Sequence, residues 1–291
     1  MISNIRKFFL LRGDGTQKDL NGANGVWLSD PAGLGAAKTP AYANLNYGFF
    51  SITDDKQDAQ ETITFTLNFT GAEPYYDYAG LVDWIFAATE LYFGYQPEGS
   101  DGDLYVRRAS VKSIAKTERG KARWLTTAVT LDCLSPWTKE ITLTAQSASG
   151  AFKVWGWEAP AVGQLPAAFR LSYKAHAART VSRLALGYKL GNDYDTKSIL
   201  FPVPLQLAAG QTLQISTAPN DYYIRRVSIT GEITSVMDKI AVAGDPIILL
   251  PPGAVLPGSD SSEPPLLQLY VDAIDALDAL SCTMLAYYRT V

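Results

Sequence analysis

Hydrophobic and polar residues alternate strictly along residues 60–69, in the run Thr62-Ile63-Thr64-Phe65-Thr66-Leu67-Asn68-Phe69. Successive side chains of a β-strand point to opposite faces, so this pattern predicts a strand with one buried face and one wet face. Three further runs of strand length, with β-branched or aromatic residues, follow at 91–95, 104–114 and 124–134. A sheet is therefore predicted for this part of the chain.

A single helix is predicted directly after Pro74, a residue that favours the first turn of a helix. The hydrophobic residues that follow recur at helical spacing, namely Tyr78, Leu81, Val82, Ile85 and Phe86. We expect this helix to lie across the sheet. Residues 27–48, in contrast, show no clear period and are predicted to be an irregular loop that binds something.

A domain boundary is predicted near residues 137–140, because Pro136 cannot donate to a strand ladder and a segment rich in Ser, Gly, Ala and Pro follows. This divides the chain into residues 1–137 and 138–291. Short strands with turn signals between them predict a β-sandwich in the second part, at residues 169–175, 181–190, 198–203, 212–217 and 222–230. Residues 266–271 and 282–288 are expected to form a closing hairpin, while 272–280 fits either a helical turn or a strand.

The predicted fold class is mainly β, as a β-rich α+β chain, and its composition agrees. The 291 residues are 47% hydrophobic and 19% charged, with a net charge of −4, which is typical of a globular protein. The negative charge argues against specific nucleic-acid binding through a basic face. No apolar run is long enough to cross a membrane, and the N-terminus has no signal pattern. Cys133 and Cys282 both lie in apolar strand-like runs and are expected to be buried, reduced thiols.

No catalytic, cofactor or metal site is predicted, and the chain is not expected to be an enzyme. His176 is the only histidine and lies beside a turn without a nearby nucleophile. Two aspartate pairs, Asp101 with Asp103 and Asp193 with Asp195, offer paired carboxylates. Both pairs lie in turn contexts where aspartate is favoured for its local backbone bonds. A glycan hydrolase that uses such a pair remains an alternative.

Trp155, Trp157 and Glu158 form a short stretch that fits a sugar-binding strand, since aromatic faces stack on sugar rings and a carboxylate holds hydroxyl groups. The basic residue of galectin sites is missing after it. A carbohydrate-binding adhesin is therefore a second alternative, and a packed aromatic pair is the competing interpretation. The remaining aromatic and apolar residues of note are candidates for subunit interfaces: Trp27, Leu34, Tyr42, Tyr47, Tyr75, Tyr76 and Trp137.

Several segments, in order, resemble the N-terminal part of siphophage distal tail proteins. They are Phe8-Phe9-Leu10-Leu11, Asp19-Leu20, Trp27-Leu28, Pro31-Ala32-Gly33-Leu34-Gly35, residues 63–69, Leu91-Tyr92, residues 104–108, residues 111–118 and Ser135-Pro136-Trp137. The similarity covers about residues 5–137.

The resemblance implies an N-terminal belt domain, sandwich-like with one helix, that closes into a hexameric ring, and a C-terminal galectin-like β-sandwich. It also implies a place in the virion, at the distal end of the tail. The implied partners are other copies of the chain, the tail-tube protein, the tail-tip hub, the C-terminus of the tape-measure protein and receptor-binding proteins.

Overall fold

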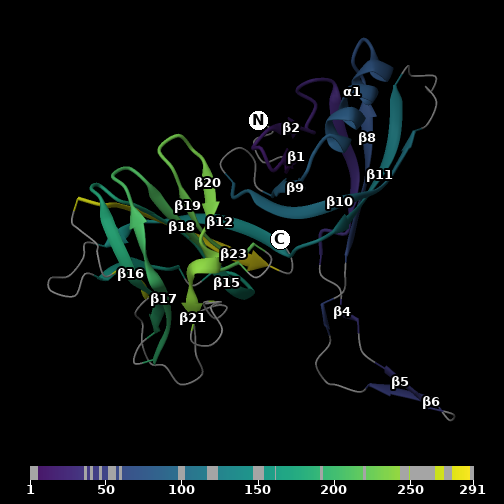
Figure 1. Cartoon of the computed structure of the whole chain (residues 1–291). Coiled ribbons are helices and arrows are strands. Elements are labelled where there is room, and N and C mark those ends of the chain that lie inside the picture. Colours follow the sequence, from purple (N-terminus) through teal and green to yellow (C-terminus); the bar gives the residue numbers. More distant parts are fainter. Residues whose placement is uncertain are drawn as a thin grey trace. The chain divides into compact units, whose positions relative to one another are not determined.

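A computed structural model of the 291-residue chain divides it into two compact units, and each is described by itself (Figure 1). The first unit spans residues 1–139 and takes in 288–291, and the second spans 140–287. The structure describes residues 6–35, 38–39, 42–45, 48–51, 57–58, 61–97, 102–116, 124–146, 154–160, 162–190, 193–218, 221–242, 249, 266–271 and 277–288. These residues are mainly β, as predicted, and one α-helix lies among them.

The first unit is a curved antiparallel sheet whose two halves share one long strand, β10 (Tyr105–Lys116). The first part of β10 pairs with β9 (Leu91–Gln96), and the remainder pairs with β11 (Leu125–Cys133). A register shift between Val111 and Ser113 marks an irregularity in the pairing with β11, where a bulge would bend the strand. Beyond β9 come β1 (Lys7–Arg12) and β2 (Gln17–Asp19), and beyond β11 come β8 (Thr62–Phe69) and β3 (Val26–Ala32).

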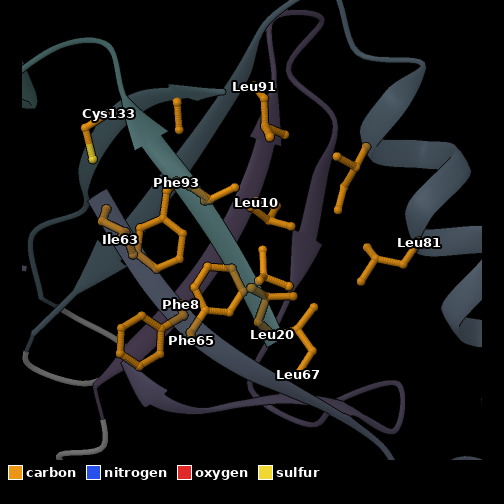
Figure 2. Packing of buried hydrophobic residues seen from close by; sticks show 14 of the residues in the cluster. Phe8, Leu10, Leu20, Ile63, Phe65, Leu67, Leu81, Leu91, Phe93 and Cys133 are labelled. Carbon is orange, nitrogen blue, oxygen red and sulfur yellow. The ribbon is translucent and has the colours of Figure 1, made fainter. Parts of the chain in front are cut away.

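The buried face of β8 confirms the predicted alternation. Ile63, Phe65, Leu67 and Phe69 are all buried in one hydrophobic core with residues of β1, β9 and β11 (Figure 2). The predicted helix is also confirmed, as α1 (Pro74–Phe86), with the proline in its first turn. Leu81 and Ile85 are buried in the same core and hold α1 against the sheet.

The prediction of an irregular segment at residues 27–48 was wrong for most of the part that the structure describes. Besides β3, this region contains β4 (Lys38–Thr39), β5 (Tyr42–Leu45) and the first residue of β6 (Gly48–Ser51). β4 pairs with β7 (Gln57–Asp58), and β5 pairs with β6. These strands escaped notice because they are short and because the register of β3 shifts between Ser29 and Ala32, around Pro31. A bulge of this kind tolerates a proline that a regular strand would exclude.

The second unit contains two antiparallel sheets. One sheet holds, in spatial order, β23 (Ala279–Tyr288), β15 (Leu165–Lys174), β18 (Thr212–Ser216), β19 (Tyr223–Val227) and β20 (Ile233–Ser235). The other holds β13 (Ala145–Gln146), β14 (Val154–Glu158), β22 (Leu266–Val271), β16 (Arg179–Leu190), β17 (Asp193–Leu207) and β21 (Ala241–Val242). The 3-10 helix η3 (Met237–Lys239) contacts β17 in one sheet and β19 in the other.

Two details differ from the sequence predictions. The expected hairpin of residues 266–271 and 282–288 does not form, because β22 pairs with β14 and β16 while β23 pairs with β15 in the other sheet. Trp137 was expected to end a domain, yet it begins a strand of its own, β12 (Trp137–Leu143). Pro136 does stop β11, but the chain re-enters the sheet directly afterwards, with Thr138 opposite Val106 of β10. Residues 272–276 lie outside the described residues, and β23 begins at Ala279.

Candidate assembly surface

Two tryptophans contact each other on the outside of the first unit. Trp27 lies on β3 and is 39% exposed, and Trp124 directly precedes β11 and is 45% exposed. Their rings meet edge to face, with centroids 6.1 Å apart and an interplanar angle of 79°. The neighbours Val26 and Leu28 pack on the core, so alternation along β3 directs Trp27 away from it. Two large aromatic side chains are thus held together in water rather than in the core.

The sheet surface beside this pair has short polar side chains and little charge. Asn68 lies opposite Trp27 on the neighbouring strand β8, and its Nδ2 donates to Ser29 Oγ at 2.9 Å. Further along the same face, Thr66 lies opposite Ala128, and Thr64 lies opposite Thr130. The tryptophan pair therefore stands at one end of a surface of short polar side chains. Such a surface is typical of a face that is covered in an assembly.

Helix α1 presents a second exposed aromatic group. Tyr76 is 75% exposed and Phe86 is 68% exposed, and Tyr75 is exposed to a lesser degree. The end of the helix is nevertheless fixed, because Arg12 of β1 places its guanidinium 4.4 Å from the ring centre of Trp84 and donates from Nε to the Trp84 carbonyl at 2.9 Å. A cation at this position satisfies a carbonyl of the last turn and interacts favourably with the negative end of the helix dipole.

Trp137 is withdrawn as an interface candidate, because the structure buries it completely. Its ring lies 6.2 Å from the rings of Phe93 and Tyr95, measured between centroids, and the guanidinium of Arg107 is 5.7 Å from its centre. Its indole Nε1 is buried and finds no hydrogen-bond partner among the described residues. Trp137 is thus a core residue of the first unit and has no exposed surface for a neighbour.

The other interface candidates differ in their positions. Trp27, Tyr75 and Tyr76 are exposed, whereas Leu34 is partly buried and packs on the core of the first unit. Tyr42 begins β5, but its side chain lies outside the described residues, as does Tyr47 altogether. Sequence reasoning missed Trp124 as a candidate. Its signal was its position next to a charged turn, outside the alternating pattern of β11.

Of the three sugar-binding candidates, Trp157 is excluded by its burial. Trp157 is fully buried in the second unit, so its ring is not available to stack on a sugar. Trp155 and Glu158 lie on the same strand, β14, but their side chains are outside the described residues. The competing interpretation of a packed aromatic residue is correct for Trp157.

The side chains considered for catalysis lie apart from one another or already form other interactions. His176 is exposed in a bend, and Asp103 forms an ion pair with Lys139, while Asp101 lies outside the described residues. Asp193 and Asp195 belong to strand β17 rather than to the turn that was predicted for them. No group of three or more metal-ligating side chains occurs in the part of the chain that the structure describes.

The two cysteines are buried and unpaired, as predicted. Burial raises the pKa of both thiols, and for Cys133 the nearby Arg107 acts in the opposite direction but less strongly. A raised pKa keeps a thiol protonated and therefore a poor nucleophile. Among the described residues, no helix has the length and apolarity to span a bilayer.

Solved structures with this fold come from phage baseplates and adsorption apparatus. A chain of the phage P2 baseplate in its activated conformation with calcium is 14% identical, with a TM-score of 0.66, and the match covers 99% of this chain and 100% of that one. The SPP1 Dit protein, described as a paradigm of the hub adsorption apparatus of phages that infect Gram-positive bacteria, is 9% identical, with a TM-score of 0.56 and coverages of 96% and 98%. The chain therefore shares the fold of these two phage proteins.

The family match is more specific. Residues 7–134 match the family model of the distal tail protein N-terminal domain, so the first unit is similar to that domain over nearly its whole length. The resemblance drawn from the sequence is thereby confirmed. No curated protein sequence is significantly similar to the chain.

Proposed function

We propose that this protein is a structural ring subunit of a phage tail tip. Copies of the first unit would contact one another head to tail and close into a ring, hexameric as the family resemblance implies. The observation that carries this proposal is the contact between Trp27 and Trp124, two exposed aromatic residues beside a sheet surface of short polar side chains. Burying this aromatic surface against a neighbour stabilises an assembly by about 25 cal/mol for each Å² removed from water.

A ring of this kind needs two different surfaces on each copy, because a head-to-tail contact joins unlike patches. The tryptophan pair supplies one candidate surface, and the exposed aromatic residues Tyr76 and Phe86 of α1 supply the other. The described strands β4 to β7 extend the first unit with further backbone for pairing. Both surfaces are available to a neighbouring subunit, since none of these side chains is needed for the core.

In the virion, the ring would lie at the distal end of the tail and join the tail tube to the tail-tip hub, close to the C-terminus of the tape-measure protein. The second unit, which the family resemblance implies to be a galectin-like domain, would anchor receptor-binding proteins. This division of roles follows the two units of the chain. In such a structure the protein acts by its shape. This role needs no cluster of catalytic groups, in agreement with the dispersed positions of its titratable groups, and it calls for no cofactor.

The experiment is a measurement of mass and shape on the purified full chain. Native mass spectrometry and negative-stain microscopy across a concentration series should show closed rings of one stoichiometry. A protein that remains monomeric at the highest attainable concentration, without and with the tail-tube protein, would overturn the proposal.

A further inference from the structure

The outer face of one sheet in the second unit carries a positive charge that forms no ion pair with a described residue. Strands β23, β15, β18, β19 and β20 bury one face, as shown by Leu171, Ile215 and Ile224. The residues between them point to the opposite side. A single row of facing residues crosses all five strands on that side: Ser281, Ser172, Gln214, Arg225 and Ser235.

Arg225 in this row is held in place by two neighbours. Its guanidinium carbon lies 4.0 Å from the centre of the Tyr223 ring, two residues earlier on the same face. Its Nε donates to Gln214 Oε1 at 2.9 Å. Neither contact is a hydrogen bond from the two terminal nitrogens of the guanidinium. An arginine fixed in this way has already lost much of its conformational freedom before any ligand arrives.

The row of Arg225 and the next row across the same strands contain no carboxylate, and several of their side chains are hydrogen-bond donors. The next row across the same strands consists of Ala279, Lys174, Thr212, Val227 and Ile233. On the other side, Arg170 is already paired with Glu140 at 2.7 Å and with Asp221 at 3.3 Å. Neither Arg225 nor Lys174 forms an ion pair with a residue that the structure describes. Two cations on this face, in a chain whose net charge is −4, therefore have no ion-pair partner among the described residues.

We propose that this face of the second unit docks an acidic segment of a partner protein, with Arg225 binding an aspartate or glutamate side chain through its two terminal nitrogens. Ile233 and Val227, at the neighbouring edge, would take an apolar side chain of the same segment. The charge complementarity selects a carboxylate, and the planar fork of an arginine matches that group with two parallel hydrogen bonds. The inference rests on the proposed function, because it names the chemistry of a partner for the anchoring unit.

The test uses the full chain and a fluorescently labelled hexaglutamate peptide, with a hexaglutamine peptide for comparison. Binding is measured by fluorescence anisotropy at low ionic strength, and backbone amide shifts map the site. Arg225→Ala should weaken hexaglutamate binding about 10-fold, the usual effect of losing a charged hydrogen-bonded pair. Arg225→Lys should recover only part of the affinity, because an ammonium lacks the fork.

The matched control is Arg226→Ala. Arg226 is the next residue and carries the same charge, but it lies on the other side of the strand, where it donates to the Gln206 carbonyl. This variant should bind within about twofold of the original chain. Equal losses for the two variants would reduce the effect to net charge and overturn the proposal. Equal binding of the two peptides, or no binding of either, would also overturn it. The same holds for amide shifts that lie outside strands β18, β19 and β20, and for stronger binding of an acidic oligosaccharide. Ring formation, measured on the same samples, reports separately on the proposed function.

Discussion

Arg107 and Glu61 form an ion pair that is buried in the core of the first unit. Arg107 also donates from Nε to the Ser135 carbonyl at 2.6 Å, and its guanidinium lies over the Trp137 ring. The backbone carbonyl of Glu61 accepts from the Cys133 amide. This single pair therefore joins the start of β8, the first part of β10 and the turn between β11 and β12. Three segments that are distant in sequence meet at these two side chains.

We predict that Glu61→Ala lowers the free energy of unfolding by about 3–5 kcal/mol, because it leaves the buried Arg107 charge without its partner. Urea denaturation followed by circular dichroism measures the change. The control is Lys112→Ala, which breaks the ion pair with Asp132 at a position where the lysine is 58% exposed and should change stability by about 1 kcal/mol or less. Equal effects of the two variants would contradict the assigned role of burial.

Trp137→Ala is expected to destabilise the first unit by about 3–5 kcal/mol, since it removes a fully buried indole and leaves a cavity beside Phe93 and Tyr95. The melting temperature should fall accordingly. Trp124→Ala removes the same side chain from an exposed position and should lower stability by about 1 kcal/mol at most. A melting temperature that does not change in Trp137→Ala would show that the indole is not part of the core.

Gly33 is required by its backbone, because its φ of +82° is one that other residues rarely adopt. A β-carbon at this position would also lie 2.0 Å from the Thr62 carbonyl oxygen. Gly33→Ala should therefore lower the free energy of unfolding by more than about 1 kcal/mol. Gly35→Ala is the control, since a β-carbon there meets nothing within 4 Å. Chemical denaturation of both variants separates strain at residue 33 from a general effect of losing glycine.

Alkaline conditions should destabilise the second unit. Burial raises the pKa of the Cys282 thiol above its ordinary value of 9.0, and burial together with the hydrogen bond to Asp278 raises the pKa of the Tyr173 phenol above 10.0. Both groups then ionise in the unfolded chain before they ionise in the folded one. Stability is full below the ordinary pKa values and falls as the pH rises above them.

The measurement is the urea midpoint between about pH 7 and about pH 11. Cys282→Ala should flatten the decline above about pH 9, although its midpoint at neutral pH will be lower because a buried side chain is shortened. His176→Ala, at an exposed position in the same unit, should leave the decline unchanged. An unaltered pH dependence in Cys282→Ala would mean that other groups cause the alkaline loss.

The sequence predicted elements whose local pattern agrees with their final environment. The alternation in Thr62 to Phe69 and the spacing after Pro74 both survive in β8 and α1, because each buries one face on the same core. Pairing was less predictable. β22 and β23 are neighbours in sequence, yet they join different sheets, since their partners are chosen by packing of the whole unit. The outer row around Arg225 arises only from the register of five strands and was not visible beforehand.

Tryptophan positions were the hardest to predict from sequence, because an indole is suited to a core, an interface or a sugar site alike. Trp137 and Trp157 are both fully buried, whereas Trp27 and Trp124 are exposed and in contact. The local sequence distinguishes only Trp124, which lies next to a charged run and outside the buried positions of β11. Trp27 is exposed because β3 turns its side chain away from the core, and Trp124 is exposed because it lies just before β11 begins. Both positions are set by how the whole sheet pairs.

The last prediction concerns the tryptophan pair. Trp27→Ser combined with Trp124→Ser should leave the melting temperature within a few degrees of the original, because neither ring belongs to the core, but should raise the concentration needed for ring formation at least 10-fold, as expected for interface aromatic residues. Native mass spectrometry over a dilution series measures that concentration. Val203→Ser, at a position of the second unit that is 75% exposed, serves as the control and should assemble normally. If the double variant also assembles normally, the ring interface lies elsewhere, and the exposed aromatic residues of α1 become the next candidates.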